Sequence, residues 1–234
     1  MQPTSKADDY ISLVEHAINF ALDAEQIKTD VNFVPRTKLH KTNLLLVNGM
    51  STPEVRIFLN ELVKEDTNYL EIGLYKGSTF ASALYGNKFK SAVAIDTFED
   101  FEGENGDLIL QSFLAACKSF KIGNFLLIRN DSFNLTEDQK KSINDINLYF
   151  YDGGHSIRDH YFALKKFYDN LSDVFIFIVD DWAHPEAESG TLFALKDLKF
   201  KVHKQWILGR SQHDKDSPGL TWHNGLYVGV LEKQ

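Results

Sequence analysis

YLEIGLYKGST, residues 69–79, indicates the architecture expected for the whole chain. A short apolar run contains an acidic residue near its end, two glycines follow with three residues between them, and small hydroxyl residues come next. This order is typical of a parallel strand that passes through a tight turn into a helix. Glycine adopts positive φ and lets a ligand approach the backbone closely. In an open α/β sheet, the turn after the first strand lies at the edge where ligands bind.

Downstream of this segment, short apolar runs alternate with amphipathic segments, which predicts a parallel sheet covered by helices on both faces. The expected strands are residues 69–72, 91–95, 125–129, 147–151, 174–179, 201–208 and 224–232. The expected helices between them are residues 78–86, 107–120, 136–144, 156–170 and 187–198, with Ser156 as a cap. The last two strands form a hairpin-like pair that closes the sheet.

The length of 234 residues allows one substantial domain with additions. We expect residues 1–66 to form an N-terminal helical cap or lid and residues 67–234 to form the catalytic part of one continuous domain. Apolar spacing predicts a helix over residues 8–24, and residues 29–48 look like an irregular loop. A second helix is expected to start near Ser51, since Pro53 and Glu54 follow it with helix-start spacing.

Composition and charge limit the function classes. The net charge of −8 argues against a nucleic-acid partner. A single cysteine, Cys117, excludes an intrachain disulfide and fits a reducing compartment, and no signal-like or membrane-spanning apolar run is present. We therefore expect a cytoplasmic protein with no membrane partner. The N-terminal segment is a candidate dimerisation element, so a homodimer is possible.

Asp96 is the first candidate binding residue, because it ends the second expected strand about 20 residues after Gly73. A carboxylate at this position can accept hydrogen bonds from both hydroxyls of a ribose. The alternative is a solvated helix cap. Asp131 and Ser132 end the third strand, where they either face an adenine or simply form a turn.

The glycine spacing separates two cofactor classes. It is not the G-x-G-x-x-G of dinucleotide-binding proteins, so a nicotinamide-dependent oxidoreductase is disfavoured. The E-x-G-x-x-x-G pattern instead resembles the first motif of class I S-adenosylmethionine-dependent methyltransferases. The resemblance implies a Rossmann-like, doubly wound, seven-stranded and mostly parallel sheet with an antiparallel last strand, and S-adenosylmethionine as cofactor. It implies these cofactor-binding residues: Met50, Glu71, Gly73, Gly77, Ser78, Asp96, Thr97, Asp131, Ser132 and Asp152.

Three carboxylates follow the fourth and fifth strands. Asp152 ends the fourth, and Asp180 and Asp181 end the fifth. Three neighbouring negative charges are costly unless a cation compensates them. Oxygen ligands favour Mg²⁺, Ca²⁺ or Mn²⁺, and no cysteine pair supports zinc. A plain turn and a helix cap are the alternatives to a metal site.

Over residues 50–234 the chain resembles the metal-dependent O-methyltransferases, which include catechol O-methyltransferase and the macrocin O-methyltransferase-like sugar enzymes. The resemblance implies that Asp152, Asp180 and Asp181 hold a metal, most simply Mg²⁺. A catalytic base lies three residues beyond the first Asp, and this chain has His155 there, where catechol enzymes have lysine. Imidazole titrates close to neutral pH, so it suits this role. His160 and His184 are weaker candidates, and Trp182 and Trp222 either line a substrate pocket or pack in the core.

The leading function is therefore metal-assisted O-methylation of a small hydroxylated metabolite, such as a sugar or a phenol. A metal-independent N- or O-methyltransferase and a non-catalytic cofactor-binding protein remain as alternatives.

Overall fold

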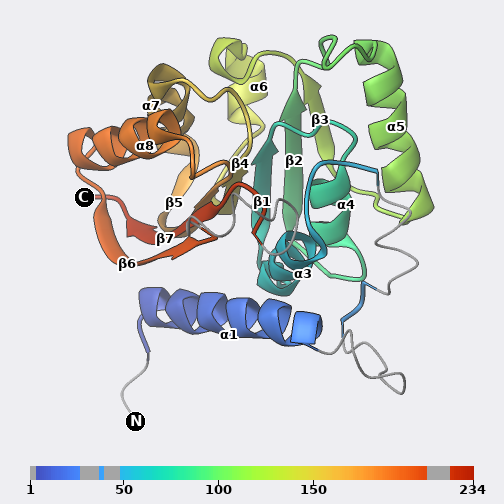
Figure 1. Cartoon of the computed structure of the whole chain (residues 1–234). Coiled ribbons are helices and arrows are strands. Elements are labelled where there is room, and N and C mark those ends of the chain that lie inside the picture. Colours follow the sequence, from blue (N-terminus) through green and yellow to red (C-terminus); the bar gives the residue numbers. More distant parts are fainter. Residues whose placement is uncertain (1–3, 27–36, 40–47, 210–221) are drawn as a thin grey trace.

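Seven strands form one sheet with helices on both faces (Figure 1). The structure is a computed structural model that describes residues 4–26, 37–39, 48–209 and 222–234. The strands in chain order are β1 Asn68–Ile72, β2 Ser91–Asp96, β3 Leu126–Arg129, β4 Ile146–Tyr151, β5 Leu171–Val179, β6 Lys201–Leu208 and β7 Leu226–Glu232.

The strand order in the sheet is β3-β2-β1-β4-β5-β7-β6. All neighbouring pairs from β3 to β5 are parallel, and β7 runs antiparallel to both β5 and β6. The order reverses between β1 and β4, which places the ligand-binding crevice of such sheets at the carboxyl ends of these strands. The predicted fold class, a doubly wound and mostly parallel sheet with an antiparallel last strand, is confirmed.

Seven α-helices and two short 3₁₀ helices are found in the described part of the chain. The α-helices are α1 Lys6–Gln26, α3 Pro53–Leu62, α4 Ser78–Leu84, α5 Gly106–Ser119, α6 Glu137–Lys141, α7 Ile157–Lys165 and α8 Pro185–Asp197 with the 3₁₀ helices η2 Ser132–Asn134 and η3 Tyr168–Asn170.

Alternate residues of each strand pack on opposite faces, as the pleat of a strand requires. In β1, Tyr69 belongs to the core on the face of α1, α3, α4 and α5, whereas Leu70 belongs to the core on the other face, which α7 and α8 cover. In β4, Phe150 and Tyr151 divide in the same way. The central strands are buried on both faces, so their side chains can reach a ligand only where the strands end.

Two helix starts follow the expected capping chemistry, and one of them is shifted. The prediction that Ser156 caps its helix is confirmed, since its hydroxyl accepts from the Asp159 N–H in a capping box. Helix α3 is capped by Thr52 rather than Ser51, with the Val55 N–H as donor at 3.4 Å. Pro53 then occupies the first turn, where its missing N–H costs nothing.

The N-terminal helix α1 packs against α3 and touches β5 and β7 (Figure 1). Its apolar face supplies Val14, Ala17 and Ala21 to the core. The predicted loop over residues 29–48 lies mostly outside the described residues, so the lid role of residues 1–66 stays a prediction. The described helices include no candidate membrane span.

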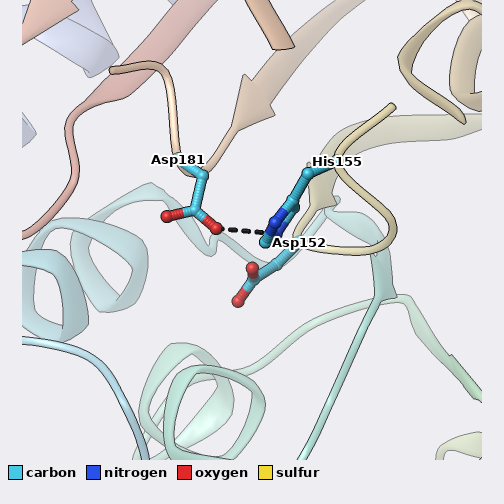
Figure 2. A group of neighbouring side chains, drawn as sticks. All are labelled: Asp152, His155 and Asp181. Carbon is cyan, nitrogen blue, oxygen red and sulfur yellow. Dashed lines mark ion pairs between the residues drawn. The ribbon is translucent and has the colours of Figure 1, made fainter. Parts of the chain in front are cut away.

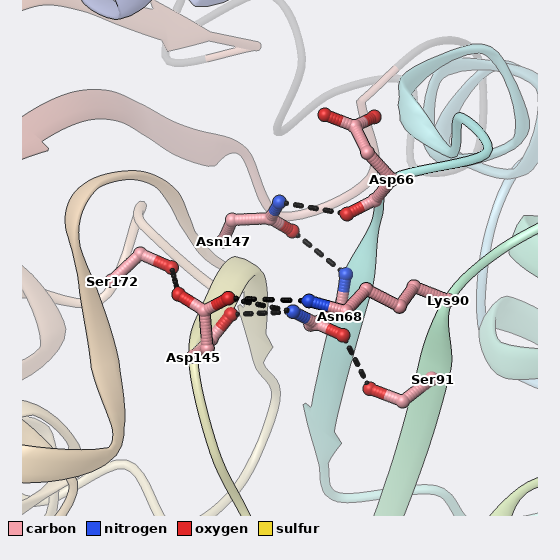
Figure 3. Close-up of polar contacts among 7 residues, drawn as sticks. All are labelled: Asp66, Asn68, Lys90, Ser91, Asp145, Asn147 and Ser172. Atoms are coloured by element: carbon pink, nitrogen blue, oxygen red, sulfur yellow. Dashed lines mark hydrogen bonds and ion pairs between the residues drawn. The ribbon is translucent and has the colours of Figure 1, made fainter.

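The starts of β1, β2, β4 and β5 are joined by a polar network, which we call the amino edge (Figure 3). Asn147 accepts from the Asn68 N–H at 2.8 Å and donates to the Asp66 carbonyl at 3.1 Å. The Asn68 amide donates to the Asp145 carbonyl, and its oxygen accepts from Ser91. A cavity of about 600 Å³ lies at this edge. Its buried amide groups are already paired, so the network holds the strand starts in register.

Candidate active site at the carboxyl edge of the sheet

The glycine turn after β1 needs both of its glycines. Gly73 has φ +84°, and a Cβ there would lie 1.7 Å from the Asp152 carbonyl oxygen. Gly77 has φ +80° as the N-cap of α4, and a Cβ there would lie 2.6 Å from the Phe113 ring. Only glycine allows this conformation and this close approach without strain. The turn therefore brings the ends of β1 and β4 together.

Asp96 fixes the glycine turn. Its carboxylate accepts from the N–H groups of Leu74 at 2.6 Å, Tyr75 at 3.0 Å and Phe98 at 2.7 Å. A carboxylate offers about four acceptor sites, so about one remains for a ligand. The sequence suggested a ribose ligand for this residue but gave no sign that it organises the turn.

A cavity of about 290 Å³ opens beside the glycine turn, near the lower end of the roughly 300–1,000 Å³ typical of ligand pockets. Five of the predicted cofactor residues line it: Gly73, Asp96, Thr97, Asp131 and Ser132. The remaining lining comes from Ile72, Ile95, Asn130, Phe133, Tyr151, Gly153, Gly154 and Asp159. Of these, Phe133 and Asp159 carried no recognisable signal in the sequence.

Asp131 is committed in part to local structure. Its carboxylate accepts from the Phe133 N–H at 2.8 Å and from the Asn134 amide at 2.6 Å, and it caps the short helix η2. The predicted turn chemistry is therefore present. Because Asp131 also lines the cavity, the turn and ligand roles do not exclude each other.

The other predicted cofactor residues lie outside the cavity lining. Glu71 is fully buried and accepts hydrogen bonds from Tyr69 and Thr79. Burial raises the pKa of Glu71 to about 8, although these hydrogen bonds oppose the rise. Ser78 is buried, with its hydroxyl 3.0 Å from that of Ser51. Gly77 caps α4, Met50 is 49% exposed, and Asp152 contributes its backbone to the contact with Gly73.

The acidic cluster lies beside this cavity. Asp180 and Asp181 are buried, at 6% and 8% exposure, and Asp152 is partly buried. Asp180 accepts from the Asp181 N–H at 2.9 Å. Within the described residues, no group donates a hydrogen bond to the Asp152 carboxylate. An unpaired carboxylate beside two others is electrostatically unfavourable.

His155 and Asp181 meet in this cluster (Figure 2). The His155 Nε2 lies 2.8 Å from Asp181 Oδ2, and the Asn224 amide donates to Asp181 Oδ1 at 2.6 Å. One ligand atom each of Asp152, His155 and Asp181 lies within 4.8 Å of the others. Asp180 is not in this group, although the sequence predicted a metal site formed by Asp152, Asp180 and Asp181. Asn224, which comes from the segment before β7, had no signal in the sequence.

The cluster shifts the pKa values of its members in different directions. Burial, followed by the charges of Asp180 and Asp181, raises the pKa of Asp152 well above its usual range. Burial, followed by Asp181, raises the pKa of Asp180 to about 7. Burial also acts to raise the pKa of Asp181, but the hydrogen bonds from His155 and Asn224 lower it overall. The hydrogen bond to Asp181 raises the pKa of His155.

The remaining aromatic and histidine candidates are not members of this group, although one of them contacts it. His160 is 1% exposed and packs edge-on against Tyr151 at 5.2 Å. The ring of His184 stacks on that of His155 at 5.4 Å. Trp182 stacks on Tyr227, and Trp222 packs edge-on against Phe58. Both tryptophans are buried, as core residues would be.

Comparisons with known proteins agree with this architecture. No protein-family model matches the sequence, and no curated protein is significantly similar to it. Among solved structures, an rRNA methylase from Streptococcus thermophilus is 17% identical with a TM-score of 0.51, covering 76% of this chain and 93% of its own. TYW2 from M. jannaschii, in complex with AdoMet, is 15% identical with a TM-score of 0.54, covering 85% and 80%. An O-methyltransferase from Bacillus cereus, in complex with SAH, is 10% identical with a TM-score of 0.51, covering 99% and 93%. The chain therefore has the class I methyltransferase fold.

The prediction that nucleic acid is not a partner is wrong. It rested on the net charge of −8, yet an rRNA methylase shares the fold over 76% of the chain. Net charge describes the long-range field of a protein and does not fix the chemistry of one local surface. Net charge alone therefore does not exclude a nucleic-acid partner.

Proposed function

We propose that this protein is an S-adenosylmethionine-dependent methyltransferase. The observation that carries the proposal is the cavity at the ends of β1 and β2, beside the glycine turn and next to the acidic cluster. The similar folds include two solved with AdoMet or SAH. The donor would lie along this cavity, with Asp96 near its ribose and with Asp131 and Ser132 near its adenine.

The residues beside the cavity fit a divalent metal ion. Asp152 has no hydrogen-bond donor among the described residues, and Asp180 and Asp181 raise its pKa further. A divalent ion would supply the missing positive charge, lower the pKa of an acceptor hydroxyl and fix its position. Asp152 and Asp181 would hold that ion, with Asp180 close by. This chemistry suits O-methylation of a small hydroxylated molecule, such as a sugar or a phenol.

The protein's own residues would arrange the acceptor. His155 is half-exposed, with 51% of its side chain accessible, so it can meet an incoming acceptor at the rim. The sequence suggested that it removes the acceptor proton. Much of the rate enhancement would come from holding the acceptor oxygen in line with the donor methyl group.

An RNA acceptor is the second candidate, favoured by the rRNA methylase of similar fold. An RNA methyltransferase would use the same donor cavity and would differ only in the acceptor that reaches the carboxyl edge of the sheet.

The test is calorimetric titration with S-adenosylhomocysteine, followed by transfer of a labelled methyl group to sugars, phenols and RNA. We expect binding at the 290 Å³ cavity, so Ser132→Trp should abolish it by filling the space. The matched control is Ser142→Trp, which fills the cavity at the amino edge and should leave binding intact. Equal affinity in both variants would contradict the assigned cavity, and transfer to RNA alone would select the second candidate.

A further inference from the structure

His155 lies against two carboxylates rather than one. Its Nε2 is 2.8 Å from Asp181 Oδ2, and a ring nitrogen of His155 also falls within 4.8 Å of an Asp152 oxygen (Figure 2). The two aspartates come from the ends of different strands, so the imidazole joins β4 to β5 across the cluster. A histidine that only relays a proton would need one carboxylate on one nitrogen and the substrate on the other.

The spacing of these atoms suits a shared ion. Protein nitrogen and oxygen ligands bind many divalent metals at roughly 2.0–2.2 Å, which places neighbouring ligand atoms about 3–4 Å apart. Atoms already within 4.8 Å of one another reach that spacing through small side-chain rotations.

The surroundings also match a ligand set. Ligands of metal ions are usually held by outer hydrogen bonds that fix their orientation. The Asn224 amide binds Asp181 Oδ1 at 2.6 Å, which leaves Oδ2 directed at His155. Asp181 has φ +56°, in the left-handed region that Asp adopts more readily than most residues other than glycine. The Asp152 carboxylate, in contrast, has no donor within the described residues.

We propose that His155 is a metal ligand together with Asp152 and Asp181, and that the site therefore prefers Mn²⁺, Co²⁺ or Zn²⁺ to Mg²⁺. This inference rests on the proposed methyltransferase function, because it concerns the metal site at the carboxyl edge of the sheet. Imidazole nitrogen suits transition-metal ions, whereas Mg²⁺ takes oxygen ligands and usually keeps several waters. A site with two carboxylates and one imidazole is thus unlike the three-carboxylate site expected from the sequence.

The direct test uses Mn²⁺ as a paramagnetic probe with the full chain. Electron spin echo envelope modulation detects a ¹⁴N nucleus bound to Mn²⁺, and we expect this coupling in the wild type. His155→Ala should remove the coupling and weaken Mn²⁺ binding about 10-fold or more. His184→Ala is the matched control, because its ring stacks on His155 and it is the neighbouring histidine. It should retain the coupling.

A second variant tests the preference between metals. His155→Asp supplies oxygen in place of nitrogen, so the ratio of Mn²⁺ to Mg²⁺ affinity should fall. Circular dichroism of each variant checks that it is folded.

Three results would overturn the inference. They are the absence of ¹⁴N coupling in Mn²⁺-loaded wild type, its persistence in His155→Ala, and the failure of Mn²⁺ to bind. Binding of S-adenosylhomocysteine in metal-free protein is measured separately. Its loss would count against the methyltransferase proposal, while ¹⁴N coupling would still support His155 as a ligand.

Discussion

The two edges of the sheet use the same residue types to opposite effect. At the amino edge, Asp145 accepts from Ser172 at 2.6 Å and lies 3.5 Å from the Lys90 ammonium, and its pKa is lowered, chiefly by the Ser172 hydrogen bond (Figure 3). At the carboxyl edge, Asp152 has no donor among the described residues and its pKa is raised. Paired carboxylates hold a fold together, whereas a carboxylate without a donor and with a raised pKa marks a candidate functional site.

The comparison also explains why the larger cavity is not the proposed site. The amino-edge cavity is about 600 Å³ and the carboxyl-edge cavity is about 290 Å³. The buried Asn68 and Asn147 at the amino edge bind each other and neighbouring backbone groups. Size alone therefore does not identify the functional edge.

The largest effect, a loss of divalent-metal affinity, is expected for Asp152→Asn. This change removes a charge without changing shape, so divalent-metal affinity and metal-dependent turnover should fall about 100-fold, or about 2.7 kcal/mol. The thermal midpoint of the metal-free protein should not fall, because the lost charge was unfavourable. Asp145→Asn is the control from the amino edge, and it should lower the thermal midpoint without changing metal affinity. A loss of metal affinity in Asp145→Asn, or a lower thermal midpoint in Asp152→Asn, would contradict this contrast between the two edges.

Much of the fold was predictable from the sequence. Apolar runs fixed the sheet and its helices, since strands buried on both faces must be apolar along their length. Asp96, Asp131 and Asp152 were identifiable because a residue at a strand end reaches the carboxyl edge. The cap of α3 was misplaced by one residue, since Ser51 and Thr52 both have capping chemistry.

Part of the site could not be predicted from sequence alone. Asn224 approaches Asp181 from 43 residues away, and no local pattern marks such a contact. Glu71 carries the acidic signature of the motif, yet its side chain points into the core and bonds to Tyr69 and Thr79. The grouping of His155 with Asp181, and not Asp180, depends on rotamers and on the positive φ of Asp181.

A second expected effect is on the pH dependence of stability. Burial, followed by the charge of Asp181, raises the pKa of Asp180 from its ordinary value of 3.8 to about 7 in the folded chain. Between pH 3.8 and about pH 7, the Asp180 carboxyl is ionised in the unfolded chain but protonated in the folded chain. Its contribution to the free energy of unfolding is therefore complete below pH 3.8 and is lost as the pH rises through about 7. Asp180→Asn should remove this loss, on the order of 2 kcal/mol, in metal-free urea melts at pH 5 and pH 8. If the free energy of unfolding changed equally between pH 5 and pH 8 in the wild type and in Asp180→Asn, this prediction would be wrong.

A smaller effect is expected at the amino edge. Asn147→Ala removes the acceptor of the Asn68 N–H and the donor to the Asp66 carbonyl. Leaving buried polar groups unpaired costs about 1–3 kcal/mol, which urea unfolding would measure. Donor binding should be unchanged, and a loss of S-adenosylhomocysteine affinity would show that the edges are coupled.

The smallest effect is expected for Lys90→Met. Its ion pair with Asp145 is 3.5 Å long, and both side chains are 61% exposed. Such surface pairs contribute between 0 and about 1 kcal/mol. A loss larger than that of Asn147→Ala, in the same urea experiment, would show that charge rather than buried hydrogen bonding holds the strand starts.

The most direct measurement is a crystal structure with S-adenosylhomocysteine and Mn²⁺, with anomalous differences collected at the manganese edge. We expect one anomalous peak between Asp152, His155 and Asp181, and adenosine in the cavity beside Gly73 and Asp131. An adenosine bound elsewhere, or a manganese peak away from these three side chains, would contradict it.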